Sequence, residues 1–312
     1  MTTRAENMYD MAVIGGGPAG MIAATTAARR GLKVLLAADS LQGQLGKIDQ
    51  IENWPGETRV TGSQLAASFA KQITEPGNSI DCRKSTVAGI RRAGQLLKIT
   101  FAGGDTVTAR TAIIATGVRH GTLGLPGEKE LSSKGVSYCV TCDGPYFKGK
   151  KVAVIGRPEQ ALAMAEQLSR IGAYAYLLQS RPVQPAFSYD RVTLLPKGWP
   201  VEIIGDQKVA ALRYHGDHSN NMTEELPVSG VFIAAERMPN TQFTDGILDL
   251  DEDGYISVDC RTMAASVPGV YAAGDVTSGP HKQITTAVGD GVKAALSAAQ
   301  YIDTQLKREI KS

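Results

Sequence analysis

Residues 9–20 read YDMAVIGGGPAG, a short apolar run that ends directly in a cluster of glycines. This pattern predicts a buried strand at Tyr9–Ile14. Pro18 then begins an Ala-rich helix that runs to about Arg30, and Lys33–Leu36 predicts the next strand. A strand, a helix and a second strand in this order are typical of a parallel α/β domain.

The same pattern returns at residues 151–161, which read KVAVIGRPEQA. We therefore predict an α/β chain with two Rossmann-like dinucleotide-binding domains in tandem. The elements expected around this second motif are a strand at Lys151–Ile155, a helix at Gln160–Ile171 and a strand at Tyr174–Leu178. The others are a hairpin of Gln95–Phe101 with Thr106–Ala109, a strand at Val270–Ala273, a helix at Thr285–Leu306, and linkers at Val118–Leu123 and Pro239–Gly246.

The composition excludes several classes of protein. The chain has 312 residues, of which 43% are hydrophobic, and a net charge of +2. So small a charge, without a run of Lys or Arg, gives no support to nucleic-acid binding. The uncharged stretch Met11–Ala28 is interrupted by three glycines and a proline, so we predict no membrane span. No signal peptide is recognisable, and a cytoplasmic location is expected.

The glycines after the first strand form a phosphate-binding pattern. Gly15 makes the turn, Gly17 lets a pyrophosphate approach the backbone, and Gly20 lets the helix pack closely on the strand. The start of the helix then offers unpaired N–H groups to the phosphates. An acidic residue that would bind a ribose is missing from the end of the second strand, and Asp39 follows slightly late.

Two cysteines, Cys139 and Cys142, are separated by two residues and followed by Asp143. Such a pair can form a disulfide, and after reduction a nearby positive charge favours the thiolate, which is the nucleophilic form. The alternatives are a zinc site and two inert buried thiols. Zinc needs about four ligands, whereas Cys82 and Cys260 are isolated and lack a neighbouring histidine, so no metal site is predicted. We expect those two cysteines to be core residues.

With these motifs the chain resembles the low-molecular-weight thioredoxin reductase family over nearly its whole length. The matching segments, in order, are GGGPAG at Gly15, GQL at Gly43, ENWPG at Glu52, ATG at Ala115, CVTCDG at Cys139, YAAGD at Tyr271 and KQITTAVGDG at Lys282. The resemblance implies FAD as cofactor, a thioredoxin disulfide as substrate and a homodimer. It also implies an FAD-binding domain at residues 1–118 and 245–312, with a pyridine-nucleotide-type domain inserted at 119–244.

The resemblance assigns roles to individual residues. Cys142 is the flavin-proximal sulfur, Cys139 attacks the substrate disulfide, and Asp143 is the general acid. The residues implied for FAD binding are Gly15, Gly17, Pro18, Ala19, Gly20, Asp39, Gln42, Gln44, Asn53, Val87, Thr116, Gly117, Gly274, Asp275, Lys282, Gln283 and Ile284. Among these, Asp275 is expected at the ribityl hydroxyls, and Lys282–Ile284 at the isoalloxazine through their backbone.

The second phosphate-binding motif departs from the family pattern. Pro158 stands where the family has its second glycine, and it has no N–H to donate. Glu159 adds negative charge where phosphates would lie. The cluster that binds the 2′-phosphate of NADPH is reduced to Gln179–Arg181 with Pro185, and Glu236 replaces a glycine of a late nucleotide-contacting loop. These changes favour an electron donor other than NADPH.

The altered motif resembles that of the ferredoxin-dependent flavin thioredoxin reductases, the NADPH-independent members of the family, so this resemblance implies reduced ferredoxin as the donor. FAD suits such a donor because it accepts single electrons and passes on pairs. Arg157, Arg181 and Arg237 map to loops around the altered motif and are expected either to form a basic docking surface or to be ordinary solvated residues. Two alternatives stay open. One is a diflavin-linked disulfide oxidoreductase with a second flavin in the former NADPH site, and the other is a non-catalytic flavoprotein.

Overall fold

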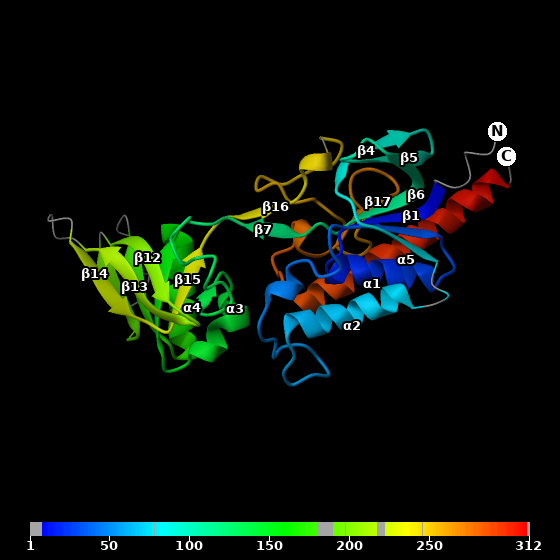
Figure 1. Cartoon of the computed structure of the whole chain (residues 1–312). Helices are drawn as coiled ribbons and strands as arrows, with labels where there is room; N and C mark the ends of the chain where they lie inside the picture. The colour runs from blue at the N-terminus through cyan, green and yellow to red at the C-terminus, as the bar shows by residue number, and fades with distance from the viewer. Residues whose placement is uncertain are drawn as a thin grey trace. The chain divides into compact units, whose positions relative to one another are not determined.

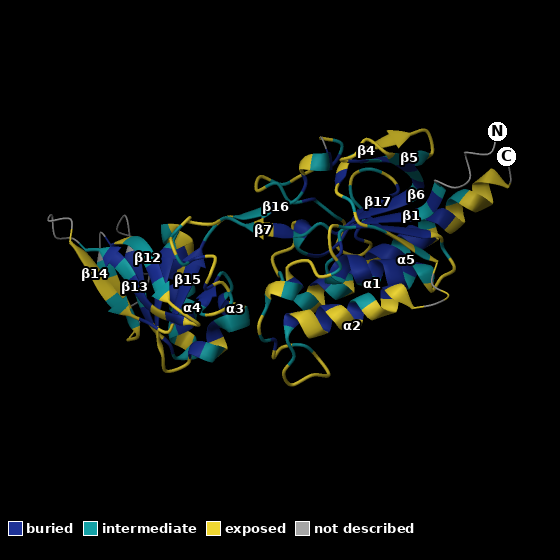
Figure 2. Cartoon of the chain, in the orientation of Figure 1, coloured by how far each residue is buried: buried dark blue, intermediate teal, exposed yellow. Residues whose placement is uncertain are grey.

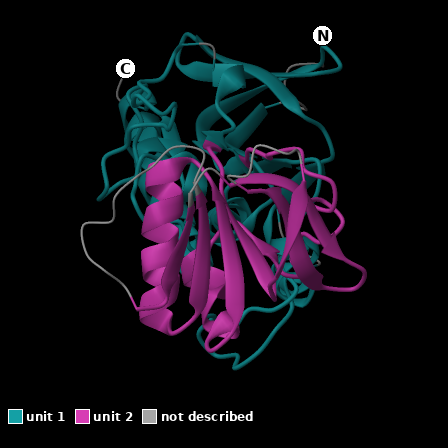
Figure 3. Cartoon of the chain, turned by 90° about the vertical axis from the view of Figure 1, so that its left-hand side faces the viewer, with its two compact units in different colours: residues 1–119, 238–312 teal, residues 120–237 magenta. Residues whose placement is uncertain are grey.

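The computed structural model describes residues 8–75, 77, 79–179, 190–196, 198–216, 222–244 and 246–310. The chain divides into two compact units (Figure 3), unit 1 with Met1–Arg119 and Met238–Ser312, and unit 2 with His120–Arg237. The division that we expected from the sequence placed residues 238–244 in the inserted domain. These residues instead pack with unit 1, since η3 (Gln242–Thr244) contacts β4 (Val87–Ala93) and the Asn240 N–H donates to Gly117 O.

Unit 1 contains a seven-stranded sheet in the order β3-β2-β1-β6-β5-β4, with β17 also paired to β6. Apart from β4 its strands are β1 (Met8–Ile14), β2 (Val34–Ala37), β3 (Ile80–Arg83), β5 (Leu96–Phe101), β6 (Thr106–Ile114) and β17 (Val270–Ala272). The first strand lies between two parallel neighbours, with Ala12 opposite Leu35 on one side and Ala112 on the other. A strand buried on both faces explains why its sequence is continuously apolar.

Three helices cover one face of this sheet (Figure 1): α1 (Pro18–Ala28), α2 (Gly62–Thr74) and α5 (Ile284–Glu309). Met11 and Val13 of β1 point into this helical layer. The alternate residues Ala12 and Ile14 point to the other face, under β4, β5 and the segment 243–276. Burial follows the same plan, with the strands buried and the outer face of α2 exposed (Figure 2).

Unit 2 has a parallel five-stranded sheet in the order β11-β10-β9-β15-β8 and an antiparallel three-stranded sheet. One face of the parallel sheet packs on α4 (Pro158–Ile171) and the other on the antiparallel sheet. The parallel strands are β8 (Val136–Ser137), β9 (Lys151–Gly156), β10 (Tyr174–Gln179), β11 (Val192–Pro196) and β15 (Gly230–Ala234). The antiparallel strands are β12 (Trp199–Gly205), β13 (Val209–His215) and β14 (Thr223–Pro227).

The segments that join the two units are short strands, β7 (Val118–His120) and β16 (Arg237–Pro239), which pair with each other. Both lie at or beside the linkers predicted at Val118–Leu123 and Pro239–Gly246. Hydrogen bonding continues beyond the pair, since the Gly121 N–H donates to Glu236 O at 2.7 Å. The chain therefore leaves and re-enters unit 1 through neighbouring strands.

The predicted α/β class with two Rossmann-like units is confirmed, and the predicted strands, hairpin and helices agree with the structure within a few residues. The prediction that Cys82 and Cys260 are core residues is wrong, because both are exposed. Cys82 lies on β3 at the edge of its sheet, and Cys260 lies in a turn that the carboxylate of Asp259 closes. No helix in the described part of the chain is long and apolar enough to cross a membrane.

Close packing between α1 and α5 generates a stability prediction. A Cβ on Gly291 would lie 2.3 Å from the carbonyl oxygen of Ala19, whereas a Cβ on Gly289 of the same helix meets nothing within 4 Å. We expect Gly291→Ala to destabilise the protein by about 1–3 kcal/mol, because backbone must move. Gly289→Ala is the matched control and should stabilise by about 0.5–1 kcal/mol through helix propensity. Urea unfolding measures both, and equal effects would contradict the packing.

Candidate functional site

The turn after β1 requires glycine at two positions for steric reasons. Gly15 has φ +120°, and a Cβ on it would lie 2.2 Å from the Ala115 carbonyl oxygen. A Cβ on Gly20 would lie 1.9 Å from the carbonyl oxygen of Gly15. These contacts bring α1 directly onto the end of β1, as the glycine pattern predicts.

Gly17 differs from these glycines, because a Cβ on it would meet no protein atom within 4 Å. It is the N-cap of α1, followed by Pro18 and the buried Ala19. No side chain caps this helix, and its first turn contains no acidic residue. An open approach to the N–H groups of a helix start is the arrangement that binds a phosphate.

The loop that contains Asp39, Gln42 and Gln44 passes directly beside this turn. A Cβ on Gly43 would lie 2.9 Å from the Cα of Gly17, so the loop backbone touches the turn. The side chains of Gln42 and Gln44 are exposed, and the amide Nε2 of Gln44 donates to the carbonyl oxygen of Val118 at 3.1 Å.

Asp39, the late candidate for ribose binding, accepts a hydrogen bond from the Thr86 hydroxyl at 2.8 Å. This bond places it beside β4, whose first residue, Val87, is buried. The structure therefore brings Asp39 and Val87 to the same part of unit 1 although the two residues are far apart in sequence.

Thr116 and Gly117 follow β6 and are held by a residue that the sequence reasoning missed. The Asn240 amide donates to the Thr116 carbonyl oxygen at 2.9 Å, and the Thr116 hydroxyl donates to Asn240 O at 2.7 Å. The Asn240 N–H also donates to Gly117 O at 3.0 Å. Asn240 stands in the segment RMPNT, and no local motif in that segment indicates its partner.

The C-terminal group of predicted residues gathers at the start of α5. Gly274 packs against α1, since a Cβ on it would lie 2.9 Å from the Cβ of Ala19, and Asp275 follows it half-buried. Lys282 donates to the carbonyl oxygen of Thr277. Ile284, the first residue of α5, packs against the helical core of unit 1.

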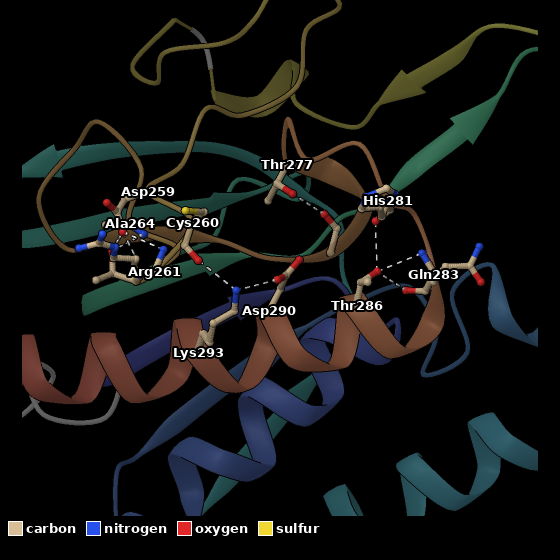
Figure 4. A network of polar contacts seen from close by, with 12 residues as sticks. Asp259, Cys260, Arg261, Ala264, Thr277, His281, Gln283, Thr286, Asp290 and Lys293 are labelled. Atoms are coloured by element: carbon tan, nitrogen blue, oxygen red, sulfur yellow. Dashed lines mark hydrogen bonds and ion pairs between the residues drawn. The ribbon is translucent and has the colours of Figure 1, made fainter. Parts of the chain in front are cut away.

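Gln283 forms the N-cap of α5 and joins two parts of the predicted site. Its N–H donates to the Thr286 hydroxyl at 3.1 Å, and that hydroxyl donates back to Gln283 O at 2.9 Å (Figure 4). The Gln283 side-chain oxygen accepts from the Asn53 amide at 3.0 Å. The ENWPG segment and the start of α5 are therefore in contact.

The start of α1 and the residues around it fit the pyrophosphate of FAD. The open face at Gly17 and the uncapped, acid-free start of α1 suit a pyrophosphate. Around them the structure gathers the loop 39–44, the turn at Thr116–Gly117 and the start of α5. These residues and the uncapped start of α1 fit the pyrophosphate of a dinucleotide such as FAD.

Cys139 and Cys142 form a disulfide, with their Cα atoms 5.3 Å apart, around the start of the short helix α3 (Val140–Asp143). The Cys142 N–H donates to the sulfur of Cys139 at 3.2 Å. Asp143 closes the same turn, since its N–H donates to Cys139 O at 3.1 Å. All three side chains are partly accessible. The sequence-predicted redox residues therefore lie on one turn of chain in unit 2.

The second glycine motif keeps the tight turn after its strand, but the residues at the start of the following helix differ. Gly156 has φ +117° and would place a Cβ 2.4 Å from the Ala234 carbonyl oxygen, as Gly15 does with Ala115. From there the motifs differ. Both helices begin with a proline and without a side-chain cap, but the N-cap of α4 is Arg157 where α1 has Gly17, and Glu159 places a carboxylate in the first turn of α4. A carboxylate at this position complements the positive end of the helix in place of a bound phosphate.

An ion pair stands beside this helix start. The guanidinium of Arg157 lies 3.5 Å from the carboxylate of Glu236, and both side chains are more than half exposed. An exposed pair of this kind adds little stability, but it partly neutralises one arginine of the expected basic surface. Arg237 is half-buried. Ser180, Arg181 and Pro185 lie outside the described residues, as does the side chain of Gln179.

Within the described ranges, no group of three or more His, Cys, Asp or Glu residues is arranged to hold a metal ion. The chemistry that the geometry offers is that of a dinucleotide site in unit 1 and a disulfide with a neighbouring carboxylate in unit 2. A family model described as pyridine nucleotide-disulphide oxidoreductase matches residues 9–291. The chain belongs to this family.

Relatives and solved structures agree with that membership. Thioredoxin reductase from Streptococcus pyogenes is 31% identical, with a TM-score of 0.90, and the match covers 96% of this chain and 100% of that chain. A ferredoxin-flavin thioredoxin reductase from Clostridium acetobutylicum is 31% identical with a TM-score of 0.53, covering 95% and 98%. Both are thioredoxin reductases, so the resemblance to this group seen in the sequence is confirmed.

A curated relative of a different kind is a component of alkyl hydroperoxide reductase, its F chain, from Pseudomonas aeruginosa, which is 37% identical over 311 residues. That match covers 96% of this chain and 59% of the relative, so the chain spans about three fifths of the relative's length. The chain thus combines membership of the pyridine nucleotide-disulphide oxidoreductase family with a thioredoxin-reductase-like fold and a disulfide between Cys139 and Cys142.

The open face at Gly17 generates a cofactor prediction. We expect Gly17→Val to lower FAD affinity at least about tenfold, roughly 1.4 kcal/mol, because the added side chain fills the space beside the helix start. The flavin-free protein should lose no more than about 1 kcal/mol, the scale of an N-cap change. Flavin retention and the urea midpoint of flavin-free protein measure the two effects. Gly20→Val is the contrasting variant and should impair folding itself. Unchanged flavin affinity in Gly17→Val would contradict the assignment of this helix start to FAD.

Proposed function

We propose that this protein is an FAD-dependent disulfide oxidoreductase that takes electrons from a donor other than a pyridine nucleotide. Reduced ferredoxin is the proposed donor, and a thioredoxin disulfide is the proposed acceptor. Electrons pass through FAD in unit 1 and through Cys139 and Cys142 in unit 2. The protein is further proposed to act as a homodimer.

The observation that carries the proposal is the contrast between the two helix starts. The α1 helix begins without acid or side-chain cap, and its N-cap glycine leaves open space. The α4 helix likewise begins with a proline and has no side-chain cap, but Arg157 replaces the N-cap glycine and Glu159 places a carboxylate in the first turn. A pyrophosphate carries negative charge, so the Glu159 carboxylate opposes its binding at α4, whereas the acid-free start of α1 favours it.

Ferredoxin as donor draws support from cofactor chemistry and from one solved relative. FAD, when bound, accepts single electrons and passes them on in pairs, which a one-electron donor requires. The Clostridium acetobutylicum protein is by its name a ferredoxin-flavin thioredoxin reductase. The residues proposed to hold FAD begin with Gly15, Gly17 and Gly20 and extend to Asp275 and Gln283.

The residues of unit 2 have distinct proposed roles. After reduction, Cys139 attacks the substrate disulfide as a thiolate, and the Cys142 N–H, 3.2 Å from that sulfur, stabilises the charge. Cys142 then attacks Cys139 and re-forms the disulfide. Asp143, whose N–H already closes the turn, supplies and recovers protons for the departing thiolates.

A donor comparison tests the proposal. Under anaerobic conditions, we expect reduced ferredoxin to bleach the flavin rapidly, whereas millimolar NADPH or NADH leaves it oxidised beyond a normal turnover time of about one second. Stopped-flow absorbance of the flavin measures each donor. Pro158→Gly with Glu159→Ala is the matched variant and should still not use NADPH, because the 2′-phosphate cluster is also altered. Rapid bleaching of the wild-type flavin by NADPH would contradict the proposal. Two flavins per chain would instead support the diflavin alternative.

A second prediction concerns the cysteines. Cys142→Ser should retain FAD and lose thioredoxin reduction, because the disulfide can no longer form. Cys139→Ser should leave a thiolate at Cys142, the sulfur proposed to exchange electrons with the flavin, and change the long-wavelength absorbance of the flavin. Cys82→Ser, an exposed free cysteine, is the control and should behave as the wild type. Full disulfide reductase activity in both single variants of the pair would mean that the pair is structural.

A further inference from the structure

A buried hydroxyl lies directly before the redox cysteines. Ser137 ends β8, opposite Phe232 of β15, and is 4% exposed. A hydroxyl removed from water needs hydrogen-bond partners inside the protein. The hydrogen-bond partners of Ser137 therefore indicate which groups this side chain positions.

The polar contacts of this hydroxyl go to the redox turn. Its oxygen accepts the Cys139 N–H at 3.1 Å. It donates to the Asp143 carboxylate at 2.5 Å, and its contact with Cys139 O is longer, at 3.3 Å. A hydroxyl has one proton, and the shorter contact is charge-assisted, so the proton goes to Asp143. Ser137 thus joins the first and last residues of the segment Cys139–Asp143.

We propose that Ser137 is a positioning residue that orients the Asp143 carboxyl and favours its ionised form during disulfide exchange. This inference rests on the proposed function, in which Asp143 exchanges protons with thiols. An O–H group that donates to a carboxylate stabilises the anion relative to the acid. Ser137 acts through Asp143 and forms no covalent bond in this exchange.

Ser137 assists a disulfide exchange that takes place in two steps. The Cys139 thiolate attacks one substrate sulfur, the substrate disulfide breaks, and the departing thiolate takes the proton of the Asp143 carboxyl. The Cys142 thiol then gives its proton to the Asp143 carboxylate and attacks Cys139. The second substrate thiolate departs with that proton. Two electrons and two protons pass to the substrate disulfide, and Cys139 and Cys142 are left as a disulfide.

The test compares two disulfides whose leaving thiols differ in basicity. A weakly acidic alkyl thiol needs a proton as it departs, whereas an aromatic thiolate departs without one. The holoenzyme is reduced with dithiothreitol and freed of reductant. It is then mixed with hydroxyethyl disulfide or with 5,5′-dithiobis(2-nitrobenzoate). Quenched-flow alkylation and mass analysis of the Cys139–Cys142 peptide follow the dithiol.

We expect Ser137→Ala to move the pH profile of exchange with hydroxyethyl disulfide upward by about one unit, since the carboxyl loses a charge-assisted hydrogen bond. The rate at the low-pH plateau should fall about tenfold, because the acid is no longer oriented. Exchange with the aromatic disulfide should stay within about twofold of the wild type, because it needs no acid. An equal change with both disulfides, or no change with either, would overturn the proposal.

Tyr138→Phe is the matched control for loss of a hydroxyl that donates to a carboxylate. The Tyr138 hydroxyl donates to the buried Glu128 carboxylate at 2.7 Å. Burial, followed by this hydrogen bond, raises the pKa of Tyr138, so its hydroxyl remains a donor. We expect this variant to lose stability and keep the wild-type pH profile. A profile shifted as in Ser137→Ala would count against a specific role for Ser137.

Asp143→Asn separates the inference from the proposed function. If this variant keeps the wild-type pH profile with hydroxyethyl disulfide, the acid role of Asp143 fails, and the inference fails with it. If Asp143→Asn changes the profile and Ser137→Ala does not, the proposed function stands and the inference alone is overturned. If oxidised thioredoxin does not react with the reduced wild type, the acceptor is wrong while both small-disulfide results still apply.

Discussion

The fold of unit 1 depends on a close contact between two helices that are distant in sequence. The α1 helix comes from the first segment of the unit and α5 from the last, and glycines at their contact let backbone touch backbone. Gly291 sits against the Ala19 carbonyl oxygen, and Gly274 against the Ala19 side chain. Because Ala19 directly follows the helix start, the same packing that closes the discontinuous unit also positions the phosphate-binding turn. Stability and cofactor binding therefore share one set of small residues.

The two glycine motifs show how one backbone turn serves opposite electrostatic environments. Gly15 and Gly156 have nearly the same positive φ, and both lie close to the backbone at the end of the neighbouring parallel strand. The difference arises in the following residues, where α1 offers bare N–H groups and α4 carries its own carboxylate. A protein that supplies the anion itself keeps the helix stable without a ligand. The second Rossmann-like unit can thus persist as a scaffold for the redox disulfide after its nucleotide motif has changed.

Local sequence patterns predicted the parts of the structure that local chemistry determines. Apolar runs followed by glycines located both strand–helix turns, and the cysteine spacing located the disulfide. Contacts between distant residues had no such signal. Asn240 holds Thr116 across 124 positions, and Glu236 pairs with Arg157 across 79. The assignment of Cys82 and Cys260 to the core was wrong, because the sequence around a cysteine does not indicate whether its strand lies at the edge of a sheet or whether its turn is exposed. Ser137 was overlooked because its importance lies in a hydrogen bond to Asp143.

The paired strands β7 and β16 have an evolutionary consequence. Since the chain leaves and re-enters unit 1 through two neighbouring strands, the inserted unit has its ends side by side, which is the arrangement in which whole domains are exchanged with little cost. Unit 2 is thus a module whose sequence can drift without disturbing the hydrophobic layers of its host. Under the proposed function, the residues that select the electron donor belong to unit 2, so the donor can change in evolution while unit 1 keeps its sequence.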